Sequence, residues 1–210
     1  MNPKILRYVF TALFAAIISV GCVIAIPLPG GVPITVQDML SIMAGTILGS
    51  FFGGVSVIIW MTLGAVGIPV FVNARGGLAI ILGPTGGYMI GYALGSLAAG
   101  FLLGTPRPDE SKKDPRNLIR IAVISLLAYS LIYLTEIPWF MRVMASKGTP
   151  ETFRTVLRLT FVPFFPCALL KWLVTIPLTA VLRPVAARYL FSAASEKDER
   201  EALERLKAES

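Results

Sequence analysis

One charged side chain in a long apolar stretch is the feature of this sequence that most directly predicts chemistry. Residues 67–91 read GIPVFVNARGGLAIILGPTGGYMIG, and Arg75 is the one charged residue between Met39 and Pro106. A cation isolated in membrane-buried sequence is energetically unfavourable and usually marks a site for a solute or an ion. The stretch therefore predicts a pocket for an anionic ligand that Arg75 neutralises. The other interpretation is an arginine that reaches back to the membrane surface and binds nothing.

The prolines and glycines around Arg75 predict the shape of this segment. At this density they do not permit a straight helix. Irregular backbone at membrane depth is tolerated only where protein or a water-filled cavity covers it. We therefore predict a re-entrant segment that lines the pocket, in which Asn73 supplies an amide beside Arg75 and Phe71 an apolar wall.

A second run, GPTGGY at residues 83–88, opens the next apolar segment. The free backbone N–H groups at the start of a helix attract negative or hydrogen-bond-accepting groups. Gly83, Gly86 and Gly87 are therefore candidate ligand contacts through their backbone, and Tyr88 adds a ring face and a hydroxyl. The alternative is a purely structural start of a helix.

Lys171 lies inside a further apolar segment, where an ammonium group needs a counter-charge or water. Glu136 and Asp38 are the two candidate partners, and a ligand carboxylate is the third. Asp38 and its neighbour Gln37 begin another segment, which either side chain could cap. Alternatively, both could direct polar groups into the cavity, so Gln37 joins the candidate ligand contacts.

Composition predicts an all-α integral membrane protein. The chain has 210 residues, of which 55% are hydrophobic and 15% are charged. This length accommodates about six spans of ~20 residues with short loops. We predict a six-helix membrane domain over residues 1–190, with a tight turn near Gly53 and Gly54, and a charged cytoplasmic tail over residues 191–210. The expected membrane segments cover residues 5–26, 36–48, 51–66, 84–103, 118–139 and 159–182.

The distribution of Lys and Arg predicts the orientation, because basic residues are enriched in cytoplasmic loops. More of them flank the two termini and the loop at residues 105–117 than the loop at residues 142–158. We therefore expect a multi-pass protein of the cell membrane with both termini in the cytoplasm. The segments at residues 27–33 and 67–91 then face outward, where an external solute would enter.

Several classes of function are disfavoured by the residues themselves. The sequence has no histidine, so the commonest metal ligand and general base is missing. We expect no catalytic residue, no metal site and no cofactor. No segment has the form GxxxxGK[ST], so ATP binding through that motif is not expected. The net charge of +7 comes largely from residues that flank apolar segments, which argues against nucleic-acid binding.

A membrane-embedded enzyme that acts on lipids is a rival interpretation. Such an enzyme needs paired acids, histidine ligands or an activated serine. Glu136 with Thr135 comes nearest to such a set. A small channel or a solitary transporter is the other rival.

Ala12 and Ala16 stand four residues apart in the first apolar segment. Small residues at this spacing let a second helix pack closely. The second helix could belong to a partner protein or to this chain.

Four motifs, in this order and spacing, resemble the BioY family, the biotin-binding S components of energy-coupling-factor (ECF) transporters. They are IPLPGGVPIT at residues 26–35, LGAVGIPVF at 63–71, RGG at 75–77 and LGPTGGY at 82–88. The resemblance extends to about residue 190. It implies the six-helix S-component fold and a protein that captures a vitamin outside the cell. It also implies a transmembrane T component and two ATPase subunits as partners, with Ala12 and Ala16 in the helix that contacts the T component.

One departure from the family concerns the last helix. The family pattern there is Pro-Gly-Asp-x-x-Lys, whereas this chain reads PCALLK at residues 166–171, so Ala168 replaces the acid and Lys171 is retained. Either Lys171 is free to hold the ligand carboxylate in place of Arg75, or an acceptor for the ureido N–H groups of biotin is lost. An unpaired buried donor costs about 1–3 kcal/mol, roughly 5–150-fold in affinity. The second case favours lipoate, which has a similar acid chain but no ureido group.

Overall fold

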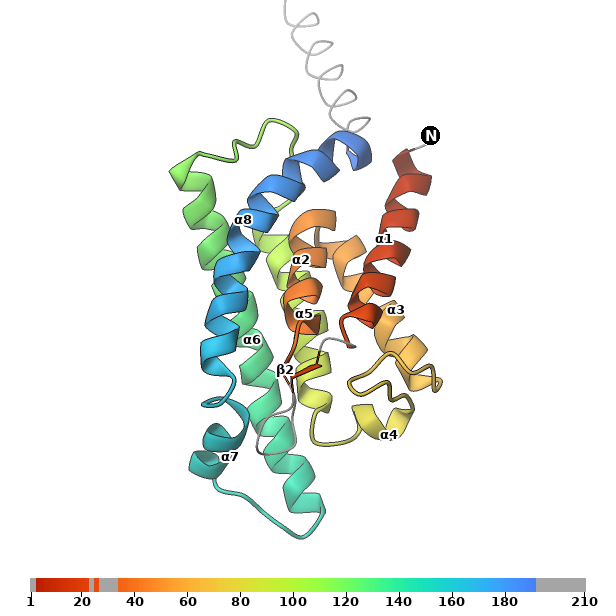
Figure 1. Cartoon of the computed structure of the whole chain (residues 1–210), viewed down its shortest axis with the longest axis vertical. Coiled ribbons are helices and arrows are strands. Elements are labelled where there is room, and N and C mark those ends of the chain that lie inside the picture. The colour runs from red at the N-terminus through yellow and green to blue at the C-terminus, as the bar shows by residue number, and fades with distance from the viewer. Residues whose placement is uncertain (1–2, 23–24, 27–33, 192–210) are drawn as a thin grey trace, which may run out of the picture.

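The structure is a computed structural model that describes the backbone of residues 3–22, 25–26 and 34–191. Within these ranges it contains helices and one short antiparallel strand pair (Figure 1). The elements are α1 (Pro3–Val20), β1 (Ala25–Ile26), β2 (Ile34–Thr35), α2 (Gln37–Leu48), α3 (Ser50–Ala65), α4 (Leu78–Ile81), α5 (Gly86–Leu103), α6 (Pro115–Ser146), α7 (Phe153–Thr160) and α8 (Phe165–Leu190). Residues 192–210 of the predicted tail and the segment at residues 27–33 lie outside the described residues.

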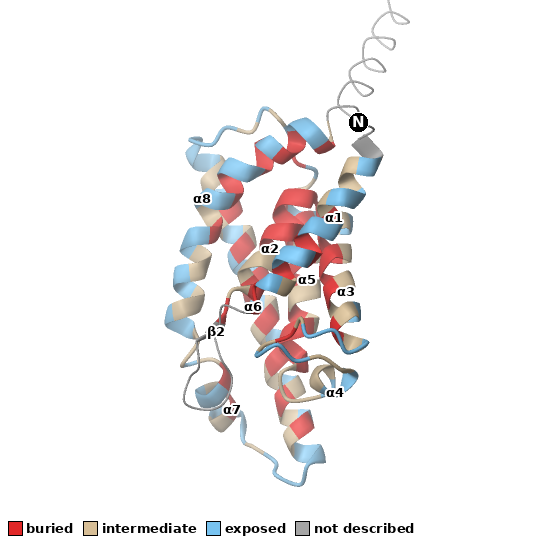
Figure 2. Cartoon of the chain, turned by 45° about the vertical axis from the view of Figure 1, so that its right-hand side comes forward, coloured by how far each residue is buried: buried red, intermediate tan, exposed pale blue. Residues whose placement is uncertain are grey.

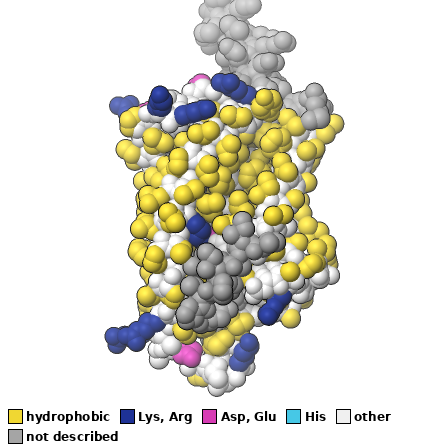
Figure 3. All heavy atoms as spheres, viewed as in Figure 1, with side chains coloured by type: hydrophobic (Ala, Val, Ile, Leu, Met, Phe, Trp, Pro, Cys, Tyr) yellow, Lys and Arg dark blue, Asp and Glu magenta, His cyan; other side chains and the backbone are white. Residues whose placement is uncertain are grey.

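The prediction of an all-α membrane protein is confirmed in outline. Three helices, α5, α6 and α8, are long and apolar enough to cross a bilayer. The apolar parts of α1 and α3 are shorter, and α2 has only 12 residues. On the face drawn in Figure 3, hydrophobic side chains cover much of the middle, and Lys and Arg gather mainly at the two ends. This band is the surface expected of a protein surrounded by lipid, whereas six membrane-crossing helices remain a prediction.

Helix α2 forms the centre of the bundle. Ten of its 12 residues are buried, which Figure 2 shows as the mostly red α2. The helix packs against α1, α3, α5 and α8. Gly45 of α2 makes this possible, because a Cβ there would overlap the backbone of Ser96 in α5. A Cβ at Gly53 of α3 would likewise overlap the backbone of Gly45. Three helices therefore meet at a point where no side chain fits.

The tight turn predicted between the second and third segments is present, although Gly53 and Gly54, which lie close to it in sequence, are inside α3. The chain reverses at Gly49, whose φ of 82° lies in the left-handed region that glycine adopts without a steric penalty. The Gly53-Gly54 pair serves close helix packing, a role that a sequence pattern does not separate from a turn.

Other boundaries also differ from those expected. The first helix ends at Val20 instead of residue 26, and α6 continues through Pro138 to Ser146. The expected segment at residues 159–182 is two helices, α7 and α8, because the chain turns between Thr160 and Phe165. Apolar residues continue through these turns, so hydropathy alone did not reveal them.

Arg183 of α8 holds one end of the bundle together. It is 1% exposed and forms an ion pair with Glu110 at 2.7 Å. Its guanidinium also donates to the carbonyl oxygens of Thr46 at 2.5 Å, Leu103 at 3.0 Å and Gly104 at 2.8 Å. These carbonyls belong to the last turns of α2 and α5, which have no partners within their own helices.

The described ends of the chain lie at this same end of the molecule. Arg7 Nε in α1 donates to the carbonyl oxygen of Leu190 at the end of α8, at 2.8 Å. Helices α4 and α7 lie at the opposite end (Figure 1). The expected separation of the termini from the segment around Arg75 is therefore present, whereas which end faces the cytoplasm stays a prediction.

Replacing Gly45 by Ala should force α2 and α5 apart. Overpacking of this kind typically costs about 1–3 kcal/mol, and we expect a lower melting temperature of the purified protein in detergent. Gly95→Ala is the matched control, because a Cβ there would meet its nearest atom, the Ala128 carbonyl oxygen, at 3.0 Å and has room otherwise. Equal melting temperatures for the two variants would contradict the packing argument.

Candidate ligand-binding site

A cavity of about 130 Å³ lies where β2, α2, α3, α5 and the segment after α3 meet. Four of the residues predicted to bind a ligand line it: Gln37, Asn73, Arg75 and Tyr88. Trp60, Met89 and Tyr92 add apolar and aromatic surface. A few polar groups in a mostly apolar hollow are the usual composition of a small-molecule site.

A tight hairpin presents Asn73 and Arg75 to this cavity. Phe71 and Arg75 exchange two backbone hydrogen bonds of 2.9 and 3.2 Å. Between them, Asn73 (φ 59°) and Ala74 (φ 52°) adopt left-handed conformations, which are unfavourable for residues that carry a Cβ. The hairpin leaves Asn73 and Arg75 exposed at the cavity rim. Strained backbone of this kind is often found in ligand-binding segments.

Phe71 anchors the base of the hairpin. It is completely buried, and its ring meets that of Trp60 edge-on at 5.3 Å. The backbone of Gly64 lies against the same ring, where a Cβ would overlap it. The predicted irregular segment is therefore held from below by packing, and only its tip is open.

Gln37 connects the hairpin segment to two helices. Its side chain is 2% exposed, and its amide nitrogen donates to the carbonyl oxygens of Ile18 in α1 and Val70, both at 3.2 Å. Trp60 Nε1 donates to the same Val70 oxygen at 3.0 Å. The amide of Gln37 thus holds the wall of the cavity in position, in addition to lining it.

Lys171 forms an ion pair with Asp38, which answers the question of its partner. The Lys171 Nζ donates to Asp38 Oδ2 and, at 3.1 Å, to the carbonyl oxygen of Thr35. The residue before α2 is Val36, and the Asp38 side chain does not cap the helix. Lys171 is not among the residues that line the cavity, although Thr35 is. The structure therefore places Lys171 behind the cavity wall.

The three glycines of the GPTGGY run lie against α6 instead of facing the cavity. Trp139 Nε1 donates to the Gly83 carbonyl oxygen at 2.9 Å, and Thr135 Oγ1 donates to that of Gly87 at 3.0 Å. A Cβ at Gly86 would overlap the Ile81 carbonyl oxygen. From the same run, Thr85 and Tyr88 line the cavity. The Tyr88 hydroxyl donates to the Thr160 carbonyl oxygen at 2.7 Å, so its ring is the part available to a ligand.

Glu136 is fully buried beside Gly87, and neither of its carboxylate oxygens has a hydrogen-bond partner among the described residues. In the part of the chain that the structure describes, there is no group of three or more Cys, Asp and Glu residues able to hold a metal ion. In the ranges that the structure describes, these side chains offer binding groups and no recognisable catalytic set.

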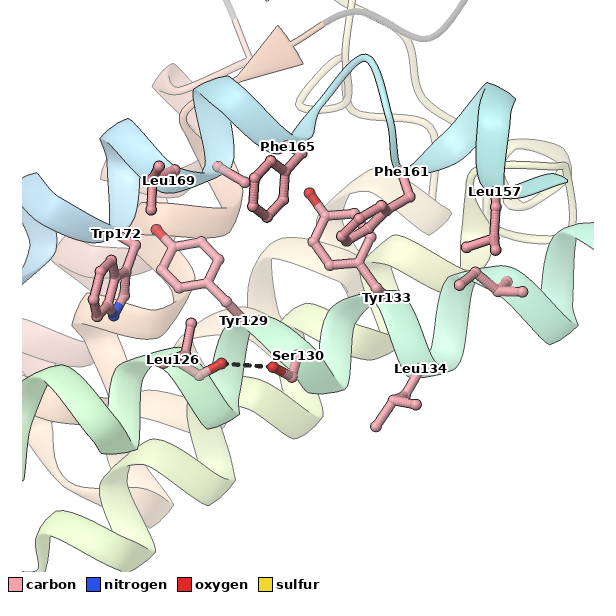
Figure 4. A pocket seen from close by; sticks show the side chains of 12 residues that line it. Leu126, Tyr129, Ser130, Tyr133, Leu134, Leu157, Phe161, Phe165, Leu169 and Trp172 are labelled. Carbon is pink, nitrogen blue, oxygen red and sulfur yellow. Dashed lines mark hydrogen bonds between the residues drawn. The ribbon is translucent and has the colours of Figure 1, made fainter. Parts of the chain in front are cut away.

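A larger groove of about 350 Å³ lies between α6, α7 and α8 (Figure 4). Tyr129, Tyr133, Phe161 and Trp172 line it, together with Ala168. Its walls are almost wholly apolar, and neighbouring side chains such as Leu134 are exposed at 66%. Of these two hollows, the smaller cavity is the candidate ligand site, because it is the one lined by charged and amide groups.

Ala12 and Ala16 lie on the outward face of α1, and both are exposed. Ala15, which lies between them on the other face of the helix, is buried, with 2% of its surface exposed. The two alanines therefore do not pack against described helices of this chain.

Comparison with known proteins identifies the family. The family model described as "BioY family" matches residues 1–188. The chain belongs to the BioY family. It is 35% identical over 167 residues to the biotin transporter BioY of Rhodobacter capsulatus, covering 78% of this chain and 85% of that protein. It is 40% identical over 131 residues to the probable biotin transporter BioY of Pyrococcus horikoshii, covering 62% and 72%.

A solved structure agrees with this assignment. The fold is similar to the crystal structure of the S-component for biotin from an ECF-type ABC transporter, with a TM-score of 0.72 and 28% identity. The match covers 87% of this chain and 93% of the other. The resemblance to the BioY family that the four sequence motifs indicated is therefore confirmed.

Replacing Gln37 by Met should loosen the hairpin while retaining side-chain volume. The Ile18 and Val70 carbonyl oxygens then lose a donor, and each lost hydrogen bond costs roughly 1 kcal/mol. We expect the amide protons of Phe71 and Arg75 to exchange faster with deuterium. Exchange in α6, to which the Gln37 side chain makes no hydrogen bond among the described residues, serves as the internal reference. Unchanged exchange in the hairpin would rule out this positioning role.

Proposed function

We propose that this chain is the substrate-binding S component of an ECF transporter for biotin, with energy supplied by separate T and ATPase subunits. The observation that carries the proposal is the cavity rimmed by Arg75 in a member of the BioY family. Its relatives are biotin transporters by name, and the similar solved structure is an S-component for biotin. Membership of a transporter family argues against a membrane-embedded lipid enzyme.

In the proposed binding mode Arg75 holds the ligand carboxylate. Lys171 is already neutralised by Asp38, whereas the Arg75 guanidinium has no hydrogen-bond or ion-pair partner among the described residues and stands exposed at the rim. A carboxylate that reaches this position can form a bidentate ion pair with the guanidinium. Asn73 lies beside it on the same hairpin and can bind a second polar atom.

The aromatic side chains would enclose the rest of the ligand. The rings of Tyr88, Trp60 and Tyr92 line the inner part of the cavity, as expected for a site that buries an apolar ring and acyl chain. Gly83, Gly86 and Gly87, which we also predicted to bind the ligand, would support the site by packing against neighbouring backbone and side chains. Lys171, the fourth such residue, would act together with Asp38 as an ion pair.

The surroundings of α1 support the proposed partner contact. The side chains of Ala12 and Ala16 are exposed and small, so a helix of the T component could pack closely against α1 at these two positions. In this arrangement both termini are cytoplasmic and the hairpin faces the outside. A solitary transporter is the alternative, and uptake in cells that lack T and ATPase subunits distinguishes the two.

Lipoate is the second candidate ligand, because Ala168 replaces the acid that the family pattern places one turn before Lys171. Calorimetry on the purified protein with biotin, dethiobiotin and lipoate tests the choice. We expect biotin to bind with a dissociation constant below about 1 μM, roughly −8 kcal/mol, and lipoate to bind more weakly. No binding of biotin at that level would contradict the proposed function, and tighter binding of lipoate would reassign the ligand.

Replacing Arg75 by Gln should weaken biotin binding by about 10–100-fold, because one charge-assisted contact of roughly 1.5–3 kcal/mol is lost. The amide of biotin, which has no carboxylate, should bind the variant and the unaltered protein equally. Arg154→Gln is the matched control, since Arg154 is also exposed but does not line the cavity. Equal losses for biotin and its amide would exclude Arg75 as the carboxylate anchor.

A further inference from the structure

The carboxylate of Asp38 uses only one of its two oxygens in the structure. Oδ2 accepts from Lys171 Nζ, whereas Oδ1 is buried and has no hydrogen-bond partner among the described residues. The whole residue is 8% exposed. Buried carboxylate oxygens without a donor are rare and unfavourable. A donor from outside the described chain is therefore expected at this position.

The ion pair lies directly behind the wall of the cavity that contains Arg75. Thr35 and Gln37 form this wall, Asp38 follows Gln37 in the first turn of α2, and Lys171 Nζ donates to the Thr35 carbonyl oxygen. Neither charged residue lines the cavity itself, so a ligand would come closest to the ion pair where it contacts Thr35 and Gln37.

The groups left over at the ion pair define the chemistry of what would bind there. The two charges cancel, so a second anion gains nothing. Asp38 Oδ1 remains as an acceptor, and an ammonium group has three protons, of which the described partners of Lys171 use two. One acceptor beside one donor complements the N–H and C=O of a cyclic urea, whereas a ring that contains only carbon and sulfur offers neither group.

We propose that Asp38 is the specificity-determining residue of this site and that it selects ligands with a ureido N–H over ligands without one. The inference rests on the proposed function and deepens it. It also accounts for Ala168, because the acid beside Lys171 is contributed here by α2 across the bundle and not by the preceding turn of α8. The chain then retains recognition of biotin despite the altered last helix.

The test is calorimetry on the full chain in lipid nanodiscs with biotin, dethiobiotin and lipoate, of which the first two carry the ureido group. Asp38→Asn should weaken both ureido ligands by about ten-fold or more, with little change for lipoate. Adding Ala168→Asp to this variant places an acid one helical turn before Lys171 and should restore much of the lost biotin affinity. If lipoate binds neither the unaltered chain nor Asp38→Asn, a ten-fold loss of biotin affinity in Asp38→Asn at an unchanged melting temperature supports the proposal.

Several outcomes would overturn it. The first is an unchanged biotin affinity in Asp38→Asn, and the second is an equal loss of affinity for biotin and lipoate. The third is an Asp38→Asn/Ala168→Asp variant that folds but does not recover biotin binding. Should Asp38→Asn fail to fold, Asp38→Asn/Lys171→Met removes both charges together, and unchanged biotin affinity in it is equally decisive. If the unaltered chain binds no biotin, the proposed function falls and takes the inference with it. If the unaltered chain binds biotin but the Asp38 variants give one of the results above, the inference fails and the proposed function stands.

Discussion

Polar groups inside an apolar bundle must find partners, and in this protein a few long side chains supply them across helices. Arg183 satisfies the final carbonyls of α2 and α5, Lys171 joins α8 to the start of α2, and Gln37 joins α2 to α1 and the cavity wall. In lipid, surface contacts between helices gain little from the hydrophobic effect, so such bonds and close packing determine which helices associate. The short helix α2 is the common member of all three connections.

This pattern gives the two ends of the molecule different characters. At the end with the chain termini, one buried guanidinium holds helix ends that would otherwise expose carbonyls to hydrocarbon. At the other end the backbone is irregular, and the hairpin at residues 71–75 contains two non-glycine residues in the left-handed region. Packing of Phe71 and the bonds to Val70 hold its base, while its tip carries the groups that would meet a ligand. A fixed frame beneath an open tip is the arrangement expected of a site that must admit a solute.

The sequence predicted the composition of this site better than its frame. The isolation of Arg75 in uncharged sequence indicated a pocket, and Asn73, Gln37 and Tyr88 do lie around the same cavity. Gly86 and Gly87 could not be assigned, because glycines at a helix start serve ligand approach and close packing equally well. The one available signal was Trp139 with Thr135, one turn apart on α6, whose donors reach this run. Asp38 and Glu136 were equal candidates for Lys171, since only tertiary packing decides which carboxylate reaches α8.

Under the proposed binding mode, the balance of charge around the cavity also favours an acid of a particular kind. Lys171 and Asp38 cancel, so they add polarity without net charge, and among the described cavity residues Arg75 is left as one uncompensated cation. A monoanion neutralises this charge, whereas a dianion would bring an unpaired negative charge into an apolar wall. The cation stands exposed at the rim, where the carboxylate can remain partly hydrated until it binds. The neutral pair is more buried, so uncharged polar groups are favoured beside it. A ligand with an acid at one end and a neutral polar ring at the other matches this gradient in both position and charge.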